Sequence, residues 1–198
     1  DSVEVEGYVR GFSRRRPDVD VSMLRFANAM GPRIHTALTD YFALPMIPAQ
    51  LGFDARLQFL HEDDLTSAMV LATTGPAVGI VNVAGDGFLT LSQCAAILGR
   101  PVFPVIGGTG LIGSTIKRWG IAEFPTDQLA LLAYGRGVDT TRMRALLGFE
   151  PEYTTRETFD DYARVVGPPI PGIDAFIDVY GGAAATVLTG ISRLVRKS

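Results

Sequence analysis

Short apolar runs along the chain alternate with longer stretches in which apolar residues recur at helical spacing. The short runs are apolar and partly β-branched, a pattern that predicts strands at 20–26, 56–61 and 79–85. The spaced stretches predict helices at 1–16, 35–43, 62 onward, 90–99, 110–119, 140–147 and 155–166. A predicted loop at 27–34 follows the first strand directly.

Residues 21–32 are the centre of this pattern. They begin as a buried strand and end in Asn-Ala-Met-Gly-Pro, where Gly31 frees the backbone and Pro32 stops any helix. A strand that opens into a loop at its carboxyl end is where α/β folds bind ligands. Asn28 is the best polar ligand group there, because one amide both donates and accepts hydrogen bonds. A loop-capping role for Asn28 is the alternative.

Capping signals mark several of the predicted helices. Three acidic residues follow position 61 and complement the positive end of a helix dipole. The other signals are Thr90 with Gln93, Asp139 with Gly148 as the stop, and Thr154 with Glu157.

Composition narrows the function classes. The net charge of −3 gives no electrostatic reason to expect nucleic acid as a partner. Cys94 is the one cysteine, so no disulfide framework exists; we interpret it as a buried thiol and expect a cytoplasmic protein. Two distant histidines and one cysteine predict no metal site. No apolar run is long enough to span a bilayer.

Four segments, in order, resemble one protein family. They are Arg-x-x-Asn-x-x-Gly-Pro at 25–32, Phe-Leu-His-Glu-Asp-Asp-Leu at 59–65, Asn-Val-Ala-Gly at 82–85 before a Thr-capped helix, and the helix pair around Leu-Gly-Phe at 147–149. Together they resemble the extended short-chain dehydrogenase/reductase family, the NAD(P)-dependent nucleotide-sugar epimerases and dehydratases. The second segment is aromatic-Ile-His-Val-x-Asp in that family.

The resemblance implies an α/β fold: the C-terminal part of a Rossmann-like parallel sheet with a small, mostly helical substrate-binding lobe. Residues 1–170 would form this portion and 171–198 an amphipathic helix. The function implied is the substrate-binding portion of an epimerase/dehydratase or dehydrogenase that acts on a sugar or sugar-like alcohol with NAD or NADP. A nucleotide-sugar is the candidate substrate and a homodimer the candidate assembly.

The family's catalytic Tyr-x-x-x-Lys pair is not in this sequence, since no tyrosine has a lysine four residues later. We expect that pair upstream of Asp1, so no residue here is assigned as catalytic and the chain is expected to be inactive alone. The resemblance implies cofactor contacts from Phe26, Ala27 and Asn28. The implied substrate contacts are Asn28, Met30, Arg33, Gln58, His61 and Arg136.

Two of these assignments have alternatives. His61 follows an apolar strand and precedes acids, so hydrogen bonding within the fold is favoured over direct substrate contact. The epimerases place a phosphate-binding arginine four residues before this histidine, where Leu57 stands here, and Arg56 is offset by one. This puts a nucleotide-diphosphate substrate in doubt and leaves Arg33 and Arg136 as looser substitutes.

Residues 107–113 fit the Gly-x-x-Gly-x-x-Gly spacing of a dinucleotide fingerprint. The preceding residues 101–105 contain two prolines, which are poor in a central strand, and no strand with an acidic end follows. We therefore interpret the match as accidental, in a connection to the helix at 110–119. A nucleotide site in a self-sufficient small domain is the alternative.

The last residues carry a helical apolar stripe. Its members are Phe176, Tyr180, Ala184, Val187, Leu188, Ile191, Leu194 and Val195. Packing of 172–198 on its own domain or on a second subunit is favoured over contact with a membrane surface, because few basic residues accompany the stripe. The rival function is a non-catalytic, nucleotide-sensing or scaffold relative of the family, whose tail helix binds a membrane or a partner.

Overall fold

The computed structural model describes residues 2–106, 109–118 and 126–167. These residues belong to two compact units, which are described separately. Unit 1 comprises Asp1–Ile34, Gln58–Phe88 and Gly137–Asp161. Unit 2 comprises His35–Leu57, Leu89–Arg136 and Tyr162–Ser198. The predicted boundary at 170–171 and the predicted tail helix lie outside the described residues.

Unit 1 contains four strands and the helices around them. The strands are β1 (Ser22–Phe26), β2 (Asn28–Met30), β5 (Phe59–His61) and β6 (Gly79–Val83). The helices are α1 (Ser2–Arg15), α3 (Glu62–Thr74), the π-helix η1 (Met143–Leu147) and α7 (Thr155–Val166), whose last five residues belong to unit 2. Both strand pairs of this unit are parallel, β1 with β6 and β2 with β5.

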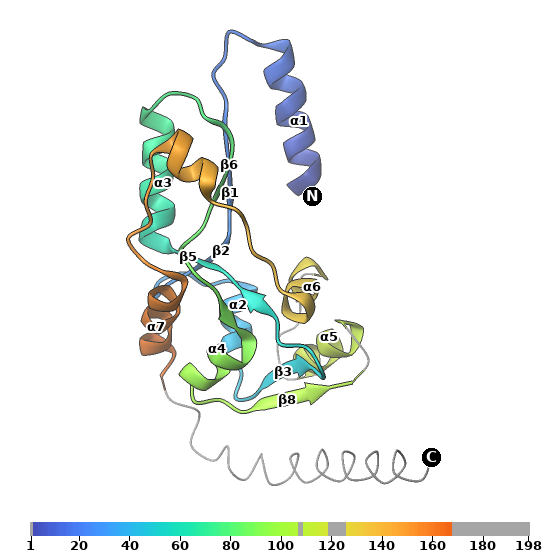
Figure 1. The fold of residues 1–198 in the computed structure, drawn as a ribbon. Coiled ribbons are helices and arrows are strands. Elements are labelled where there is room, and N and C mark those ends of the chain that lie inside the picture. Colours follow the sequence, from blue (N-terminus) through green and yellow to red (C-terminus); the bar gives the residue numbers. More distant parts are fainter. Residues whose placement is uncertain (1, 107–108, 119–125, 168–198) are drawn as a thin grey trace, which may run out of the picture. The chain divides into compact units, whose positions relative to one another are not determined.

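The chain changes its pairing partner between β1 and β2 (Figure 1). Phe26 lies opposite Val83 at the end of β6, and Asn28 lies opposite Phe59 at the start of β5. Between them, the Ala27 amide donates to the Val83 carbonyl at 2.8 Å. Residues 26–28 therefore lie where one extended segment passes from one neighbouring strand to another.

The core of unit 1 lies between α3, η1 and the strands. Leu65, Ala68 and Ala72 recur at three- and four-residue spacing on α3, which directs them to one side of the helix. They pack with Leu60, Val78, Val81, Val83, Met143, Leu147 and Phe149. Burial of one such large apolar side chain contributes roughly 1.5–3 kcal/mol, so this cluster holds the strands in register.

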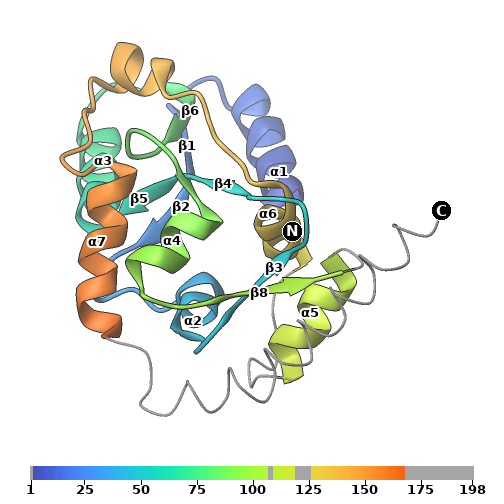
Figure 2. The same cartoon turned by 60° about the horizontal axis from the view of Figure 1, so that its bottom comes forward.

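The described residues of unit 2 form two further strand pairs. Its strands are β3 (Ile47–Gln50), β4 (Arg56–Leu57), β7 (Leu89–Thr90) and β8 (Val102–Val105); β3 and β8 are parallel, β4 and β7 antiparallel. Its helices are α2 (Ala37–Ala43), α4 (Leu91–Ile97), α5 (Thr109–Arg118) and α6 (Thr126–Tyr134). Helix α5 packs against α6 and against β3 (Figure 2).

The interior of unit 2 is mostly apolar, with a few satisfied polar groups. The Tyr41 hydroxyl donates to the Pro48 carbonyl at 2.8 Å, and the Tyr162 hydroxyl donates to the Thr39 carbonyl at 2.6 Å. Burial raises the pKa of both phenols, so they stay neutral donors. Each buried hydroxyl thus replaces water by a backbone acceptor.

Most predicted elements are confirmed. The capping boxes form as predicted: Thr90 with Gln93 begins α4, and Thr154 with Glu157 begins α7. Gly148 adopts a φ of 65° at the end of η1, a conformation that favours glycine. Cys94 is buried. Among the described residues, no helix combines the length and apolar composition needed to cross a bilayer.

Three predictions about local structure are wrong, and a fourth holds with another helix type. The loop at 27–34 contains β2, and the strand at 56–61 is interrupted at residue 58. The helix at 140–147 is largely a π-helix. Residues 102–105 form a strand in spite of Pro104, and its partner β3 contains Pro48. A two-stranded sheet leaves one edge of each strand unpaired, and proline is tolerated at such an edge.

Candidate functional site

The candidate site lies at the carboxyl ends of two parallel strands in unit 1. Strand β2 ends at Met30 and leads into Gly31, and β5 ends at His61 and leads directly into α3. Since the strands are parallel and Met30 is paired with His61, both ends lie at the same edge of the sheet. Such an edge is the usual place for ligands in α/β folds.

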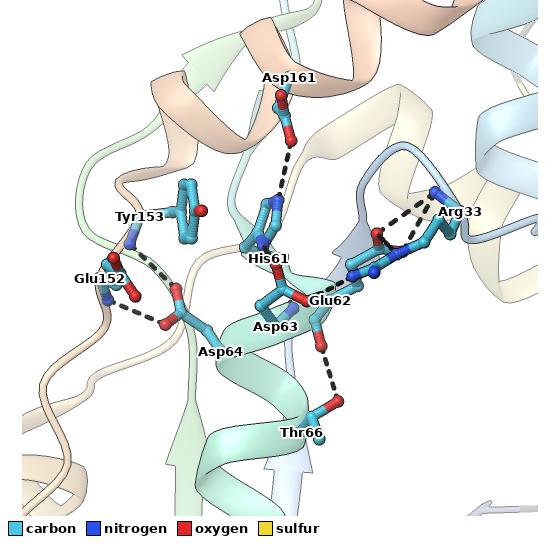
Figure 3. Close-up of polar contacts among 9 residues, drawn as sticks. All are labelled: Arg33, His61, Glu62, Asp63, Asp64, Thr66, Glu152, Tyr153 and Asp161. Carbon is cyan, nitrogen blue, oxygen red and sulfur yellow. Dashed lines mark hydrogen bonds and ion pairs between the residues drawn. The ribbon is translucent and has the colours of Figure 1, made fainter.

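Glu62, the first residue of α3, fixes the segment that follows β2 (Figure 3). Its side chain is 7% exposed, and its Oε1 accepts from the Arg33 Nε at 2.7 Å. The Arg33 amide also donates to the two carboxylate oxygens, at 3.3 and 3.2 Å. Nη2 of Arg33 bonds to Asp63, and the bonds to Glu62 and then to Asp63 raise the pKa of the guanidinium. Arg33 is therefore engaged through its backbone and its side chain.

Gly31 makes room for this carboxylate. A Cβ at position 31 would lie 2.7 Å from both Cγ and Cδ of Glu62, a distance that real Cβ atoms do not show. The glycine is thus required by close approach of the Glu62 side chain, in addition to the backbone freedom predicted from the sequence.

His61 holds α7 against the start of α3. Its Nδ1 accepts from the Asp63 amide at 3.2 Å and so caps α3. That role places the proton on Nε2, which lies 3.2 Å from the Asp161 Oδ2 and donates to it. The ring is stacked on Tyr153 with centroids 3.8 Å apart and is 1% exposed. Both nitrogens of His61 are therefore used within unit 1.

Two more buried polar residues complete the cluster. Asp64 is 3% exposed and accepts from the amides of Glu152 and Tyr153, at 2.9 and 3.0 Å. Gln58 donates from Nε2 to the Gly85 carbonyl at 2.9 Å and accepts at Oε1 from the Val138 amide at 2.9 Å. The segment 58–64 thus ties five distant parts of unit 1 together through its side chains, and we call it the polar hub.

Asn28 differs from the hub residues. It is half-buried in β2, and its side chain makes no hydrogen bond within the part of the chain that the structure describes. Next to it, Phe26 is 37% exposed and Ala27 is half-buried. An apolar ring, a small residue and an available amide are thus consecutive at the point where the strand changes partner.

Most of the other predicted ligand residues are less available to a ligand than Asn28. Met30 is fully buried, and Gln58 and His61 are hydrogen-bonded within the hub; their ligand contacts stay predictions. Arg136 is exposed, and its amide donates to the Arg56 carbonyl. Arg136 belongs to unit 2, and the other predicted site residues belong to unit 1.

Sequence reasoning missed the buried acids. From the sequence alone, Glu62 and Asp64 are only charges that complement a helix dipole, yet in the fold each is a buried acceptor for main-chain amides. The available signal was Glu62 at a position where the resembled segment has valine. In the described ranges, no three or more His, Cys, Asp or Glu side chains gather as metal ligands.

Comparison with known proteins gives relatives but no family. No protein-family model matches the sequence. An uncharacterized protein of Mycobacterium tuberculosis is 46% identical over 165 residues, which cover 83% of this chain and 44% of that protein. A second uncharacterized protein of that organism is 32% identical over 145 residues, covering 72% of this chain and 16% of the protein. The chain therefore spans less than half the length of the curated relatives that it matches.

Solved structures establish the fold. Thermus thermophilus UDP-glucose 4-epimerase with NAD matches at a TM-score of 0.57 and 17% identity, covering 81% of this chain and 50% of that chain. The Thermotoga maritima UDP-glucose 4-epimerase with UDP-glucose matches at a TM-score of 0.56 and 18% identity, covering 82% of this chain and 50% of that chain. A Streptomyces venezuelae dTDP-glucose 4,6-dehydratase with NAD matches at a TM-score of 0.54 and 18% identity, covering 77% of this chain and 45% of that chain. The predicted α/β, Rossmann-like fold is thus confirmed for most of the chain, which spans about half of each of these structures.

Proposed function

We propose that this chain is the substrate-side portion of an NAD(P)-dependent epimerase/dehydratase or dehydrogenase that acts on a sugar or sugar-like alcohol, with a nucleotide-sugar as the candidate substrate. The observation that carries the proposal is Asn28: a half-buried amide that makes no hydrogen bond within the described part of the chain, directly after the carboxyl end of the parallel pair β1 and β6. The likeness in fold to nucleotide-sugar epimerases and dehydratases supports it.

The residues around Asn28 suit one edge of a nicotinamide and a sugar hydroxyl. The partly exposed Phe26 ring offers an apolar surface, Ala27 beside it packs against the core, and the Asn28 amide offers both a donor and an acceptor group. When bound, the nicotinamide would supply hydride transfer at a sugar carbon. The role of this chain is to orient the reacting carbon, because a hydrogen bond to a substrate hydroxyl fixes its direction.

We assign the remaining chemistry to another part of a longer protein. Since no tyrosine here has a lysine four residues later, the proton-transferring pair would lie outside this chain. The pyrophosphate-binding loop and most of the NAD or NADP contacts would lie there as well. This chain spans 44% of the Mycobacterium tuberculosis relative and 50% of the Thermotoga maritima epimerase, which agrees with such a division.

A calorimetric titration tests the proposal. The 198-residue chain should bind NADH negligibly, and the longer protein should bind NADH and turn over UDP-glucose or a related sugar. Micromolar affinity of the 198-residue chain would contradict the division and favour the 107–113 segment as a nucleotide site. Cofactor binding by the longer protein without any turnover would favour the non-catalytic, nucleotide-sensing alternative.

A further inference from the structure

We propose that Glu62 is a positioning residue: it fixes the segment 31–33 beyond Asn28 and keeps the Arg33 guanidinium from binding an anionic group of a ligand. The inference rests on the proposed function in one respect, namely that this edge of the sheet faces the substrate. It reverses the prediction that Arg33 substitutes for a phosphate-binding arginine.

The geometry makes Arg33 a structural cation. Glu62 receives bonds from the Arg33 amide and from Nε, so one buried carboxylate fixes both the main chain and the side chain of that residue. Asp63 receives Nη2. A guanidinium binds a phosphate or carboxylate through two parallel N–H groups, and on Arg33 the Nε–H is taken by Glu62 and an Nη2–H by Asp63, so that edge of the group is occupied.

The local charge points in the same direction. The Arg33 side chain is 71% exposed, yet its single positive charge lies beside two carboxylates, of which Glu62 is buried. The net charge of these three groups is negative, so a ligand anion placed over Arg33 meets repulsion as well as attraction. A neutral hydroxyl meets no such repulsion, so this edge should favour a sugar without a carboxylate over a sugar acid.

The first test measures the position of the segment in the 198-residue chain, without any ligand. Hydrogen exchange at the Arg33 amide should become about tenfold faster in Glu62→Gln, the size expected for one hydrogen bond to a charged group. Asp63→Asn is the matched control and should leave that amide unchanged, because the Asp63 carboxylate bonds to the Arg33 guanidinium and not to the Arg33 amide. The Glu152 amide, which is bonded to Asp64, serves as the internal reference.

Gly31→Ala gives an independent variant that keeps every charge. The added Cβ must displace the Glu62 side chain, so it should reproduce the faster exchange at Arg33. Unchanged exchange in both folded variants would overturn the positioning role.

The second test titrates inorganic phosphate into the same chain and follows the Arg33 Nε–H signal by NMR. The wild-type signal should respond only weakly, and Glu62→Gln should bind phosphate about tenfold more tightly, because a charge-assisted contact becomes available. Equal responses of the two proteins would overturn the claim that Glu62 withholds Arg33.

Turnover by the longer protein extends the test to substrates. Glu62→Gln should lower the KM for UDP-glucuronic acid relative to that for UDP-glucose by about tenfold. An unchanged ratio would overturn the inferred preference. If the wild-type protein binds neither compound, the proposed function fails, while the exchange and phosphate measurements still decide the role of Glu62.

Discussion

Unit 1 and unit 2 differ in the buried polar groups that join their segments. Unit 1 contains the polar hub, in which buried side chains such as Glu62 and Asp64 accept from main-chain amides of distant segments. In unit 2, apolar side chains such as Phe42 fill the interior, and the buried hydroxyls of Tyr41 and Tyr162 donate to backbone carbonyls of the same unit. A buried polar network tolerates few alternatives, whereas apolar packing tolerates many. The difference predicts that geometry is specified more sharply in unit 1, where the candidate site lies.

The largest expected effects should not distinguish the units. Phe159 is fully buried and stacked on Phe59 in unit 1, and Phe42 is fully buried in unit 2. Phe159→Ala and Phe42→Ala should each lower the free energy of unfolding by about 3–5 kcal/mol, because both lose transfer free energy and leave a cavity. Urea denaturation measures this loss. A much smaller loss for one of them would show that its unit can collapse around the cavity.

A comparison of one carboxylate from each unit should reveal the difference between the units. Asp64 in unit 1 is buried and accepts from two amides, whereas Asp54 in unit 2 is exposed and accepts from the amide and hydroxyl of Ser92. Asp64→Ala should cost about 3 kcal/mol, since two buried amides lose a charged acceptor. Asp54→Ala should cost about 1 kcal/mol or less, because water replaces the carboxylate. Equal losses in urea denaturation would contradict the comparison.

Within unit 1, two asparagines separate a role in the candidate site from a role in stability. Asn28→Ala in the longer protein should cost roughly 1–3 kcal/mol in transition-state stabilisation, seen as lower kcat/KM, with an unchanged melting temperature. Asn82→Ala is the matched control, since its amide donates to the Asp139 carbonyl at 3.2 Å in the same unit. That variant should lower the melting temperature and leave turnover per folded molecule intact. The reverse pattern would assign Asn28 a structural role.

The smallest expected effect is a pH dependence at the surface of unit 1. Hydrogen bonds from the backbone and side chain of Thr154 lower the pKa of Glu157 below 4.5, its ordinary value. A carboxyl with a lowered folded-state pKa contributes stability above its unfolded pKa, and this contribution is lost as pH falls through the folded pKa. The stability difference between wild type and Glu157→Gln should therefore be present at neutral pH and vanish in acid. A difference that persists in acid would show that it does not arise from the charge.

Several features of the fold could be read from local sequence because their causes lie within a few residues. Pro17 ends α1, and Thr90 with Gln93 begins α4, since a cap needs only groups one turn apart. The strands at 22–26 and 79–83 follow from short apolar runs. For the site, the same reasoning found Asn28 and Gly31, which lie on or directly after such a strand.

Only the tertiary structure decided which segments meet. Nothing near Ala27 in sequence indicates a change of partner from β6 to β5, and nothing near Gln58 indicates that its amide serves two distant backbone groups. Glu62 and Arg33 are 29 residues apart, and His61 and Asp161 are 100 residues apart. Whether an acid after a strand is a solvated charge or a buried acceptor depends on what packs above it. That choice is made by chain segments far away in sequence, whose approach no local pattern encodes.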